Sequence, residues 1–551
     1  MILFQETPNP MKTAQWFCQF ILEKKPFTLL TLILSGIFLL RLPTLFVEYY
    51  DIDLLTSFLS AKNALAGLPF HENKGPLYHL ILNASFKLFG LHGGSFHFAG
   101  IIIIALTSGF LYLLGKRMFS LRAGILAALL YGFLVSSFNR HFMAINGEMV
   151  YNLFFAASYY FFYRGFFEKK TAFYLPLALS LALAALTKFQ GIWVFLSLLA
   201  FLIFVFPAFR FSDRARKRYY LILTAALVTL TALAVLDWQI TQIVFSGKIR
   251  DSFTSLIQYA TVQGFSWLFP IKLIHRAGML MVYHAPLWIP ALWVLIRFFK
   301  KPGQDLKRAY LSTLFLFLFA TIFITGDRLY FHYFVQLYPA LALMAAPEIL
   351  KFLEQKRLQK TFFLTLIIPM AFVFFWNVKD ALITRFYPRA FYEEPQALYY
   401  FRLIFFGQEK DYLLPQKAYV PVLDYLKHNA RPDDRLLVWP VGAELTYFSG
   451  LNPAVLSFWH EYEAIRVIQA FRKGNPEPLK NFENQMISWI RQANPHYFAD
   501  VSLAPTVYFK RYGNLSDNFP GVRIYLDQAF DPVGQWEGVR LWKKRENEKS
   551  R

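Results

Sequence analysis

Charged side chains of both signs are concentrated in one segment near the N-terminus. Asp51 and Asp53 come first, and Glu72 and Lys74 each follow one of them 21 positions later. An acidic side chain beside a membrane can act as a general base or bind a metal ion, and a lysine can neutralise a phosphate. This combination predicts transfer of a group from a lipid phosphate, with Asp53 acting on the acceptor and Lys74 holding the phosphate.

The composition predicts a polytopic α-helical membrane protein. Of the 551 residues 56% are hydrophobic and 19% aromatic, and apolar stretches of bilayer-helix length recur along the chain. The net charge of +22 comes largely from Lys and Arg in short segments between these stretches. The positive-inside bias accounts for that placement, so nucleic acid is not a predicted partner. The single cysteine, Cys18, cannot form an intrachain disulfide.

About eleven transmembrane helices are predicted, with the N-terminus in the cytoplasm and the C-terminus outside. The first would remain as an anchor, because it is too long for a cleaved signal and no small-residue site follows it. A long outer loop is expected at 237–276. The predicted spans are 27–46, 97–115, 121–137, 149–163, 172–187, 191–209, 219–236, 279–296, 309–325, 331–349 and 361–377.

Two helices are expected inside the first outer loop, 47–96. Apolar residues at helical spacing over 53–66 predict an amphipathic helix lying at the membrane interface. Pro76 favours the first turn of a second helix that runs to about Phe89. Residues 1–377 would then form the transmembrane catalytic module, with this loop as its catalytic element.

The composition changes at about residue 378, where charged residues become frequent and no further apolar stretch reaches span length. Strands are expected at 435–439, at 497–501 and near 539, with a helix at 477–494. Alternating helices and strands predict a small α/β domain with a largely parallel sheet over 378–551, on the outer face of the membrane. No glycine-rich phosphate loop accompanies it.

The order of residues in the first outer loop resembles that of GT-C glycosyltransferases, in the superfamily of protein O-mannosyltransferases and lipid A aminoarabinose transferases. The resemblance selects Asp53 over Asp51 as the catalytic carboxylate and implies a polyprenyl-phosphate sugar as donor. The matching positions are Asp53, Ala61, Gly67, the segment NKGPLY with Lys74, Pro76 and Tyr78, and the pair Phe89–Gly90.

Further segments resemble the same superfamily. Glu148, at the outer start of the fourth span, matches a second acidic residue that faces the active site. Lys188 in LTKFQG matches a lysine turn, and His332 lies in a His-Tyr-Phe segment before a proline-containing span. These residues are implied in catalysis (Glu148) or substrate binding (Lys188 and His332). In the first outer loop, the predicted substrate-binding residues are Asp51, Glu72, Lys74 and Tyr78. Arg328 could grip the donor phosphate or merely reach the membrane surface as a helix-end arginine.

The sequence departs from the family pattern at three positions. Leu54 follows Asp53 where many relatives have an acidic residue, Asn73 precedes Lys74 where aminoarabinose transferases have glutamate, and Gly75 replaces a second proline. These differences argue against aminoarabinose transfer and leave the sugar open. A divalent metal also stays open, because Asp53, Glu148 and His332 could converge.

The resulting prediction is a glycosyltransferase of the bacterial inner membrane that transfers a sugar to a protein, glycan or lipid acceptor at the outer face. The alternative is a lipid or polysaccharide transporter without transferase activity. No internal repeat is evident, and the charged residues gather at one face rather than at mid-membrane, which disfavours that alternative. A structural subunit of an envelope complex is a third, weaker interpretation.

Overall fold

The computed structural model describes the chain in segments. Asp51, Glu72 and Arg328 lie outside them, as do the predicted spans 219–236 and 361–377 and most of the predicted loop 237–276. The described residues are 26–46, 52–65, 74–136, 142, 144–205, 267–301, 305–323, 329, 331–353, 416–440, 443–454, 467–468, 470–471, 474–504 and 515–545.

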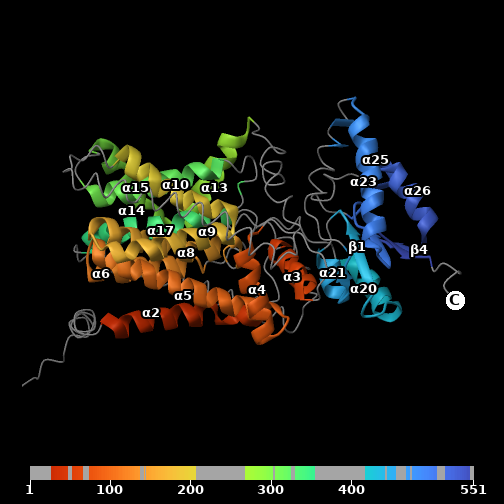
Figure 1. Ribbon diagram of the computed structural model, residues 1–551, viewed down its shortest axis with the longest axis horizontal. Coiled ribbons are helices and arrows are strands. Elements are labelled where there is room, and N and C mark those ends of the chain that lie inside the picture. The colour runs from red at the N-terminus through yellow and green to blue at the C-terminus, as the bar shows by residue number, and fades with distance from the viewer. Residues whose placement is uncertain are drawn as a thin grey trace, which may run out of the picture.

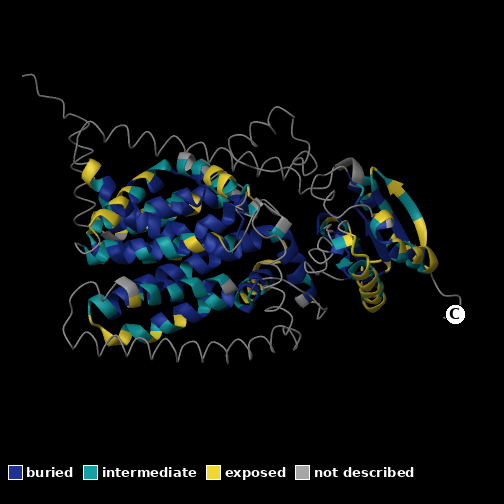
Figure 2. Ribbon diagram, turned by 90° about the horizontal axis from the view of Figure 1, so that it is seen from above, coloured by how far each residue is buried: buried dark blue, intermediate teal, exposed yellow. Residues whose placement is uncertain are grey.

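Most of the N-terminal part is a bundle of helices that run along the long axis of the molecule (Figure 1). One hydrophobic core, built from buried side chains of all these helices, runs through the bundle (Figure 2). The bundle helices are α2 (Pro26–Arg41), α5 (Gly93–Met118), α6 (Leu121–Leu134), α8 (Gly147–Phe162), α9 (Tyr174–Thr187), α10 (Ile192–Ala200), α13 (Phe269–Tyr283), α14 (Ala285–Lys300), α15 (Leu306–Ile322) and α17 (Tyr338–Leu353).

Two described helical segments, Gly93–Met118 and Phe331–Phe352, are long and apolar enough to cross a bilayer. Shorter apolar helices cover 28–41, 121–134, 171–187 and 192–203. One predicted span is wrong: the stretch 279–296 is not one helix, because α13 ends and α14 begins at His284. Pro286 favours a new first turn there, and α13 itself begins at Phe269, inside the predicted loop.

The two helices predicted within residues 47–96 form where the sequence predicts them. They are α3 (Ile52–Leu65) and α4 (Pro76–Phe89), and Gly90 ends α4 with a φ of 95°. The position of α3 at the membrane interface remains a prediction, but its polar face is not exposed. Polar residues such as Thr56 and Ser60 are buried together with its apolar face, because a C-terminal segment covers the polar side.

The C-terminal residues form a five-stranded sheet in the order β2-β1-β3-β5-β4. Hydrophobic side chains cover both of its faces in two separate clusters. The strands are β1 (Arg435–Trp439), β2 (Asn452–Pro453), β3 (Tyr497–Asp500), β4 (Phe530–Trp536) and β5 (Val539–Lys544); the main helices are α20 (Gln416–Asn429), α21 (Ala443–Ser449), α23 (Glu477–Ala493) and α26 (Pro520–Ala529).

The predicted strands at 435–439, 497–501 and near 539 are present as β1, β3 and β5, but the sheet is mixed. Strand β1 pairs in parallel with β2 and β3, whereas β5 is antiparallel to both β3 and β4. The reversal occurs at Glu537 and Gly538, which adopt φ values of 43° and 88°. Two successive positive φ angles are typical of a tight hairpin turn, which makes the last two strands antiparallel.

The C-terminal sheet domain contacts the bundle through α3 (Figure 1). The Lys62 ammonium group donates to the main-chain oxygens of Gly450 at 2.7 Å and Leu451 at 3.2 Å. The amide of Asn63 donates to the oxygen of Pro453 at 3.4 Å. Helix α21 packs along the same helix. The helix that carries Asp53 is therefore held between the bundle and residues almost 400 positions away in the sequence.

Glu444 in α21 should make the stability of this contact depend on pH. Its side chain is buried, and neither carboxyl oxygen has a hydrogen-bond partner among the described residues. Burial raises the pKa of Glu444 to about 8. The folded protein therefore keeps a proton that the unfolded chain releases above pH 4.5, so the free energy of unfolding falls as the pH rises from 4.5 to 8.

We predict that Glu444→Gln removes this loss, which is at most about 1.4 kcal/mol per pH unit. Thermal unfolding of the full-length protein in detergent at pH 5 and pH 8 measures it. The variant should unfold at a higher temperature than the wild type at pH 8 and at a similar temperature at pH 5. Asp424→Asn, at an exposed carboxylate of α20, is the control. An equal pH response in the wild type and Glu444→Gln would contradict the prediction.

Candidate active site

The segment predicted as the first outer loop brings Asp53, Ser57 and Lys74 together. Asp53 and Ser57 lie one turn apart in α3, and the Ser57 hydroxyl donates to the main-chain oxygen of Asp53 at 2.9 Å. Lys74 lies just before α4; its ammonium group donates to the Ser57 hydroxyl at 2.5 Å and to the same Asp53 oxygen at 3.1 Å. The side chain of Lys74 is buried, so these contacts fix where its charge lies. The four-residue spacing from Asp53 could have indicated Ser57 in advance.

The ring of Tyr78 packs against the side chain of Lys74. The Lys74 ammonium group lies 4.9 Å from the centre of the Tyr78 ring, within the range of a cation–π contact. The Tyr78 hydroxyl donates to the main-chain oxygen of Ile145 at 3.0 Å, and its ring meets Phe96 at the start of α5 edge to face. The side chain is fully buried, so the predicted substrate-binding role of Tyr78 remains a prediction, and its observed contacts position α4 and Lys74.

A second charged group contains Glu148 and Lys188. The Lys188 ammonium group lies 2.5 Å from Oε1 of Glu148, and both side chains are almost fully buried. Oε2 of Glu148 is also buried and has no hydrogen-bond partner among the described residues. The ring of Tyr333, which sequence reasoning did not assign to the site, lies 5.5 Å from the lysine nitrogen. His332 interacts electrostatically with Glu148.

One backbone hydrogen bond joins the two charged groups. The main-chain N–H of Gly75 donates to the oxygen of Thr187 at 2.9 Å. Lys74, which precedes Gly75, and Lys188, which follows Thr187, therefore lie on neighbouring segments. A Cβ atom at Gly75 would lie 2.1 Å from the main-chain oxygen of Leu186. Proline would in addition remove the donor. The departure from the family pattern at Gly75 therefore has a structural reason.

The three residues that could have converged on a divalent metal do not form one cluster in the described part of the chain. Among the described residues, no group of three or more His, Cys, Asp or Glu side chains lies close enough to hold a metal ion. Asp53 and Glu148 belong to the two separate groups above, and His332 lies with Glu148. Asp51, Glu72 and Arg328 are outside the described residues, so their roles remain predictions.

Comparisons with known proteins place this geometry in a known fold. The family model of dolichyl-phosphate-mannose-protein mannosyltransferases matches residues 73–238, which include Lys74, Glu148 and Lys188. No curated protein sequence matches the chain. Among solved structures, ArnT from Cupriavidus metallidurans bound to undecaprenyl phosphate is similar, with a TM-score of 0.59 and 13% identity over 93% of this chain and 97% of that one.

The archaeal oligosaccharyltransferase AglB from Archaeoglobus fulgidus is also similar. In its complex with an inhibitory peptide and a dolichol-phosphate, the TM-score is 0.51 and the identity 12%, over 93% of this chain and 73% of that one. These matches confirm the resemblance predicted from the sequence. The chain has the fold of GT-C membrane enzymes and resembles the mannosyltransferases and aminoarabinose transferases of that class.

We predict that Gly75→Ala destabilises the folded protein by about 1–3 kcal/mol, because the added methyl group meets a main-chain oxygen that cannot move aside freely. Gly109→Ala is the matched control, since a Cβ atom at that helical position would have no neighbour within 4 Å. Thermal unfolding of both variants in the same detergent measures the difference. Equal midpoints for the two variants would show that the approach of residues 75 and 187 is not tight.

A second prediction concerns the buried pair. Glu148→Gln or Lys188→Met alone leaves a buried charge without its partner and should cost about 3–5 kcal/mol, whereas the double variant should recover much of that loss. A double-mutant cycle on unfolding free energies measures the coupling. The exposed pair Arg523–Asp527 provides the control cycle, with an expected coupling below about 1 kcal/mol. Additive losses at Glu148 and Lys188 would contradict the pairing.

Proposed function

We propose that this protein is a membrane glycosyltransferase that moves a sugar from a polyprenyl-phosphate donor to a protein, glycan or lipid acceptor at the outer face of the membrane. The observation that carries the proposal is the Gly75–Thr187 hydrogen bond, which holds two buried lysines on neighbouring segments. Lys188 pairs with the carboxylate of Glu148, and Lys74 contacts the main chain of Asp53. The undecaprenyl phosphate bound to ArnT and the dolichol-phosphate bound to AglB support a polyprenyl phosphate as the donor.

The lysines would act on the leaving group. As the bond between the sugar carbon C1 and the phosphate oxygen breaks, negative charge develops on the departing polyprenyl phosphate. Lys74 and Lys188 would stabilise that charge, and their effect is strengthened because both are screened from water. Arg328, predicted near the same end of the site, would add a third cation.

Asp53 would act on the acceptor. Its carboxylate takes the proton of the acceptor hydroxyl or amine while the acceptor atom forms its bond to C1, so the anomeric configuration inverts. Asp53 is only half-buried at the start of α3, which is consistent with access for an acceptor. We further propose that Glu148 holds Lys188 through Oε1 and that Oε2 accepts a hydrogen bond from a substrate hydroxyl, with His332 beside it.

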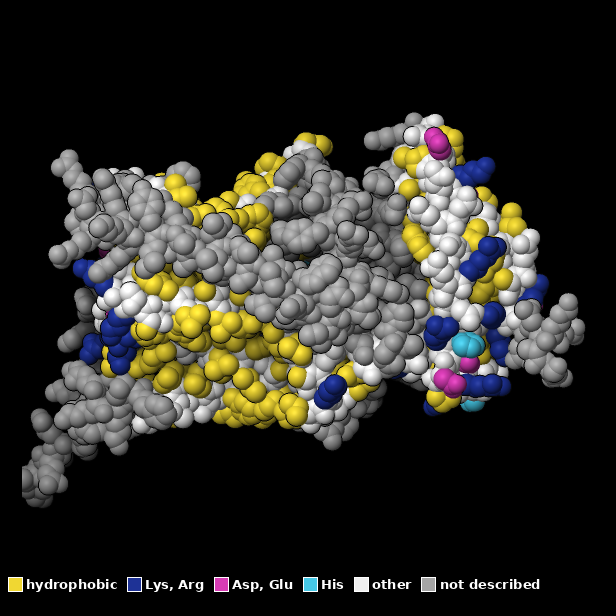
Figure 3. All heavy atoms as spheres, viewed as in Figure 1, with side chains coloured by type: hydrophobic (Ala, Val, Ile, Leu, Met, Phe, Trp, Pro, Cys, Tyr) yellow, Lys and Arg dark blue, Asp and Glu magenta, His cyan; other side chains and the backbone are white. Residues whose placement is uncertain are grey.

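The arrangement of the bundle supports the predicted orientation. Phe96, next to Tyr78 of the site, lies near the start of α5, and Met118 at its end accepts a hydrogen bond from Lys307. The 22 residues between them span about 33 Å of helix, close to the thickness of a bilayer core. Lys and Arg side chains gather at the far end of the bundle, and a hydrophobic band covers its middle (Figure 3).

We therefore propose a module of about eleven spans over residues 1–377 in the inner membrane, with the site at the outer face and the α/β domain of residues 378–551 outside. The contact of Lys62 with Gly450 and Leu451 supports this placement, because it puts the C-terminal domain at the same end of the bundle as Asp53. The acceptor peptide tethered to the Archaeoglobus enzyme supports a peptide as one acceptor class to test.

The test is sugar transfer by the purified full-length protein, with a panel of radiolabelled polyprenyl-phosphate sugars and mixed membrane acceptors. Asp53→Asn should lower the rate by about 10²- to 10⁴-fold, because the base is lost. Lys74→Gln should lower it by about 10²-fold, because an amide replaces the charge at the leaving group.

Lys87→Gln, at an exposed lysine near the end of α4, the helix that follows Lys74, is the matched control and should retain full activity. Thermal unfolding of each variant separates loss of activity from loss of fold. Equal activity in all three variants would overturn the site assignment. A transport assay with the same lipids would then test the alternative function.

A further inference from the structure

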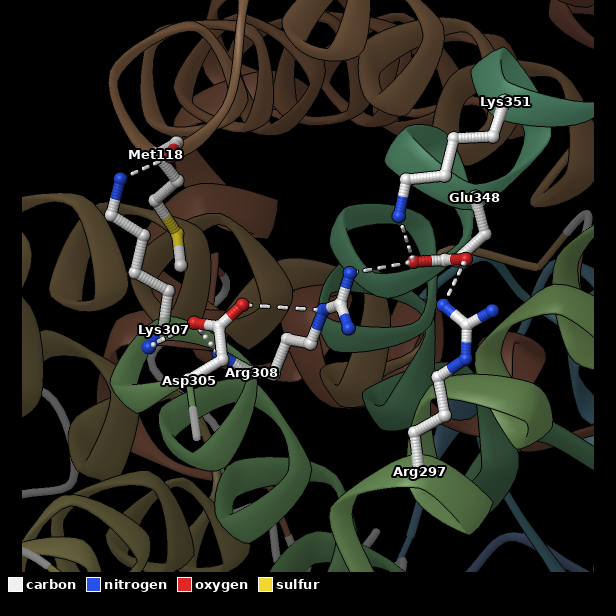
Figure 4. A network of polar contacts seen from close by, with 7 residues as sticks. All are labelled: Met118, Arg297, Asp305, Lys307, Arg308, Glu348 and Lys351. Atoms are coloured by element: carbon white, nitrogen blue, oxygen red, sulfur yellow. Dashed lines mark hydrogen bonds and ion pairs between the residues drawn. The ribbon is translucent and has the colours of Figure 1, made fainter. Parts of the chain in front are cut away.

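A third charged group, separate from the two in the candidate site, lies at the other end of the bundle. It surrounds Glu348 of α17 (Figure 4). One carboxylate oxygen accepts from Arg297 of α14 at 3.0 Å. The other accepts from Arg308 of α15 at 3.1 Å and from Lys351 at 3.0 Å. Glu348 is buried, and side chains from three helices therefore meet at one carboxylate that the proposed transfer reaction does not use.

The group keeps an excess of positive charge. Three cations share Glu348, and Asp305 offsets one of them through Arg308 at 3.3 Å, so three positive charges less two negative charges leave one. The side chains of Arg297 and Lys351 remain 42% and 52% exposed. Both are thus held in place by a buried acid and still accessible to an anion from outside the bundle.

An apolar stripe leads away from Arg297 along the outside of α14. Its members recur at helical spacing, at least two-fifths of each side chain is exposed, and the opposite face of the helix is buried in the core. The guanidinium group of Arg297 lies 5.1 Å from the ring of Trp293 within this stripe. The stripe consists of Ile289, Trp293, Ile296 and Phe299.

We propose that this surface binds an anionic phospholipid, with the headgroup phosphate on Arg297 and Lys351 and an acyl chain along the α14 stripe. The planar guanidinium group suits a phosphate, and the exposed stripe suits a hydrocarbon chain. Charge and apolar area meet at one helix end, where a lipid presents the same two features in the same order. The assignment is independent of the transfer reaction. Lys307, next to Arg308, contacts Met118 at the end of α5, and that end lies about 33 Å along the helix from the candidate site.

The experiment measures the thermal unfolding of the full-length protein in one detergent as short-chain phosphatidylglycerol is added. Phosphatidylcholine of the same chain length is the uncharged comparison, and glycerol 3-phosphate supplies the anion without acyl chains. The triple variant Arg297→Gln/Glu348→Gln/Lys351→Gln removes two cations together with their carboxylate, so no buried acid is left unpaired. Lys116→Gln/Lys170→Gln removes two exposed cations elsewhere on described parts of the bundle and is the matched control.

Phosphatidylglycerol should raise the unfolding temperature of the wild type and of the control, and phosphatidylcholine should not. The triple variant should need about tenfold more phosphatidylglycerol for the same shift, because each cation near a lipid surface contributes attraction. Arg297→Lys, which keeps the charge but not the planar fork, should weaken the response less. The proposal is overturned if the triple variant responds like the control, if both lipids act equally, or if glycerol 3-phosphate alone reproduces the shift.

Discussion

The site depends on one close approach of two backbone segments, at Gly75 and Thr187. Their 2.9 Å hydrogen bond is possible because residue 75 has no Cβ atom, which would otherwise meet the main-chain oxygen of Leu186. Lys74 and Lys188 flank this contact, and each is then fixed by its own partners, Ser57 and Glu148. Both lysines are buried, and burying a charge costs free energy that the surrounding hydrogen bonds must offset.

Contacts elsewhere in the segment offset that cost. The Lys74 side chain lies over Tyr78, and Tyr78 is in turn tied to Ile145 ahead of Glu148. On its other side, α3 is held to the C-terminal domain through Lys62. The α/β domain therefore covers one face of α3, the helix that carries Asp53. In the proposed reaction, lysines held in this way would receive a phosphate without first reorganising.

Local sequence signals were sufficient for the helices that carry the candidate site residues, whose roles remain predictions. Helix α4 begins at Pro76 and ends before Gly90, as predicted. The acidic and basic residues of the two charged groups were selected from their order along the chain. Contacts between distant residues were not readable. The cover on α3 comes from residues near 443–453, so its buried polar face could not be predicted. The role of Gly75 depends on residue 187, and the antiparallel strand β5 depends on a turn that strand periodicity does not encode.

The most direct test of this account is equilibrium binding of undecaprenyl phosphate to the full-length protein, compared between Lys74→Gln and the control Lys87→Gln. If Lys74 holds the donor phosphate, the first variant binds at least about tenfold more weakly while its unfolding temperature stays close to that of the control. If both variants bind undecaprenyl phosphate equally well, the lysines beside the Gly75–Thr187 contact do not form the phosphate site, and the central claim is wrong.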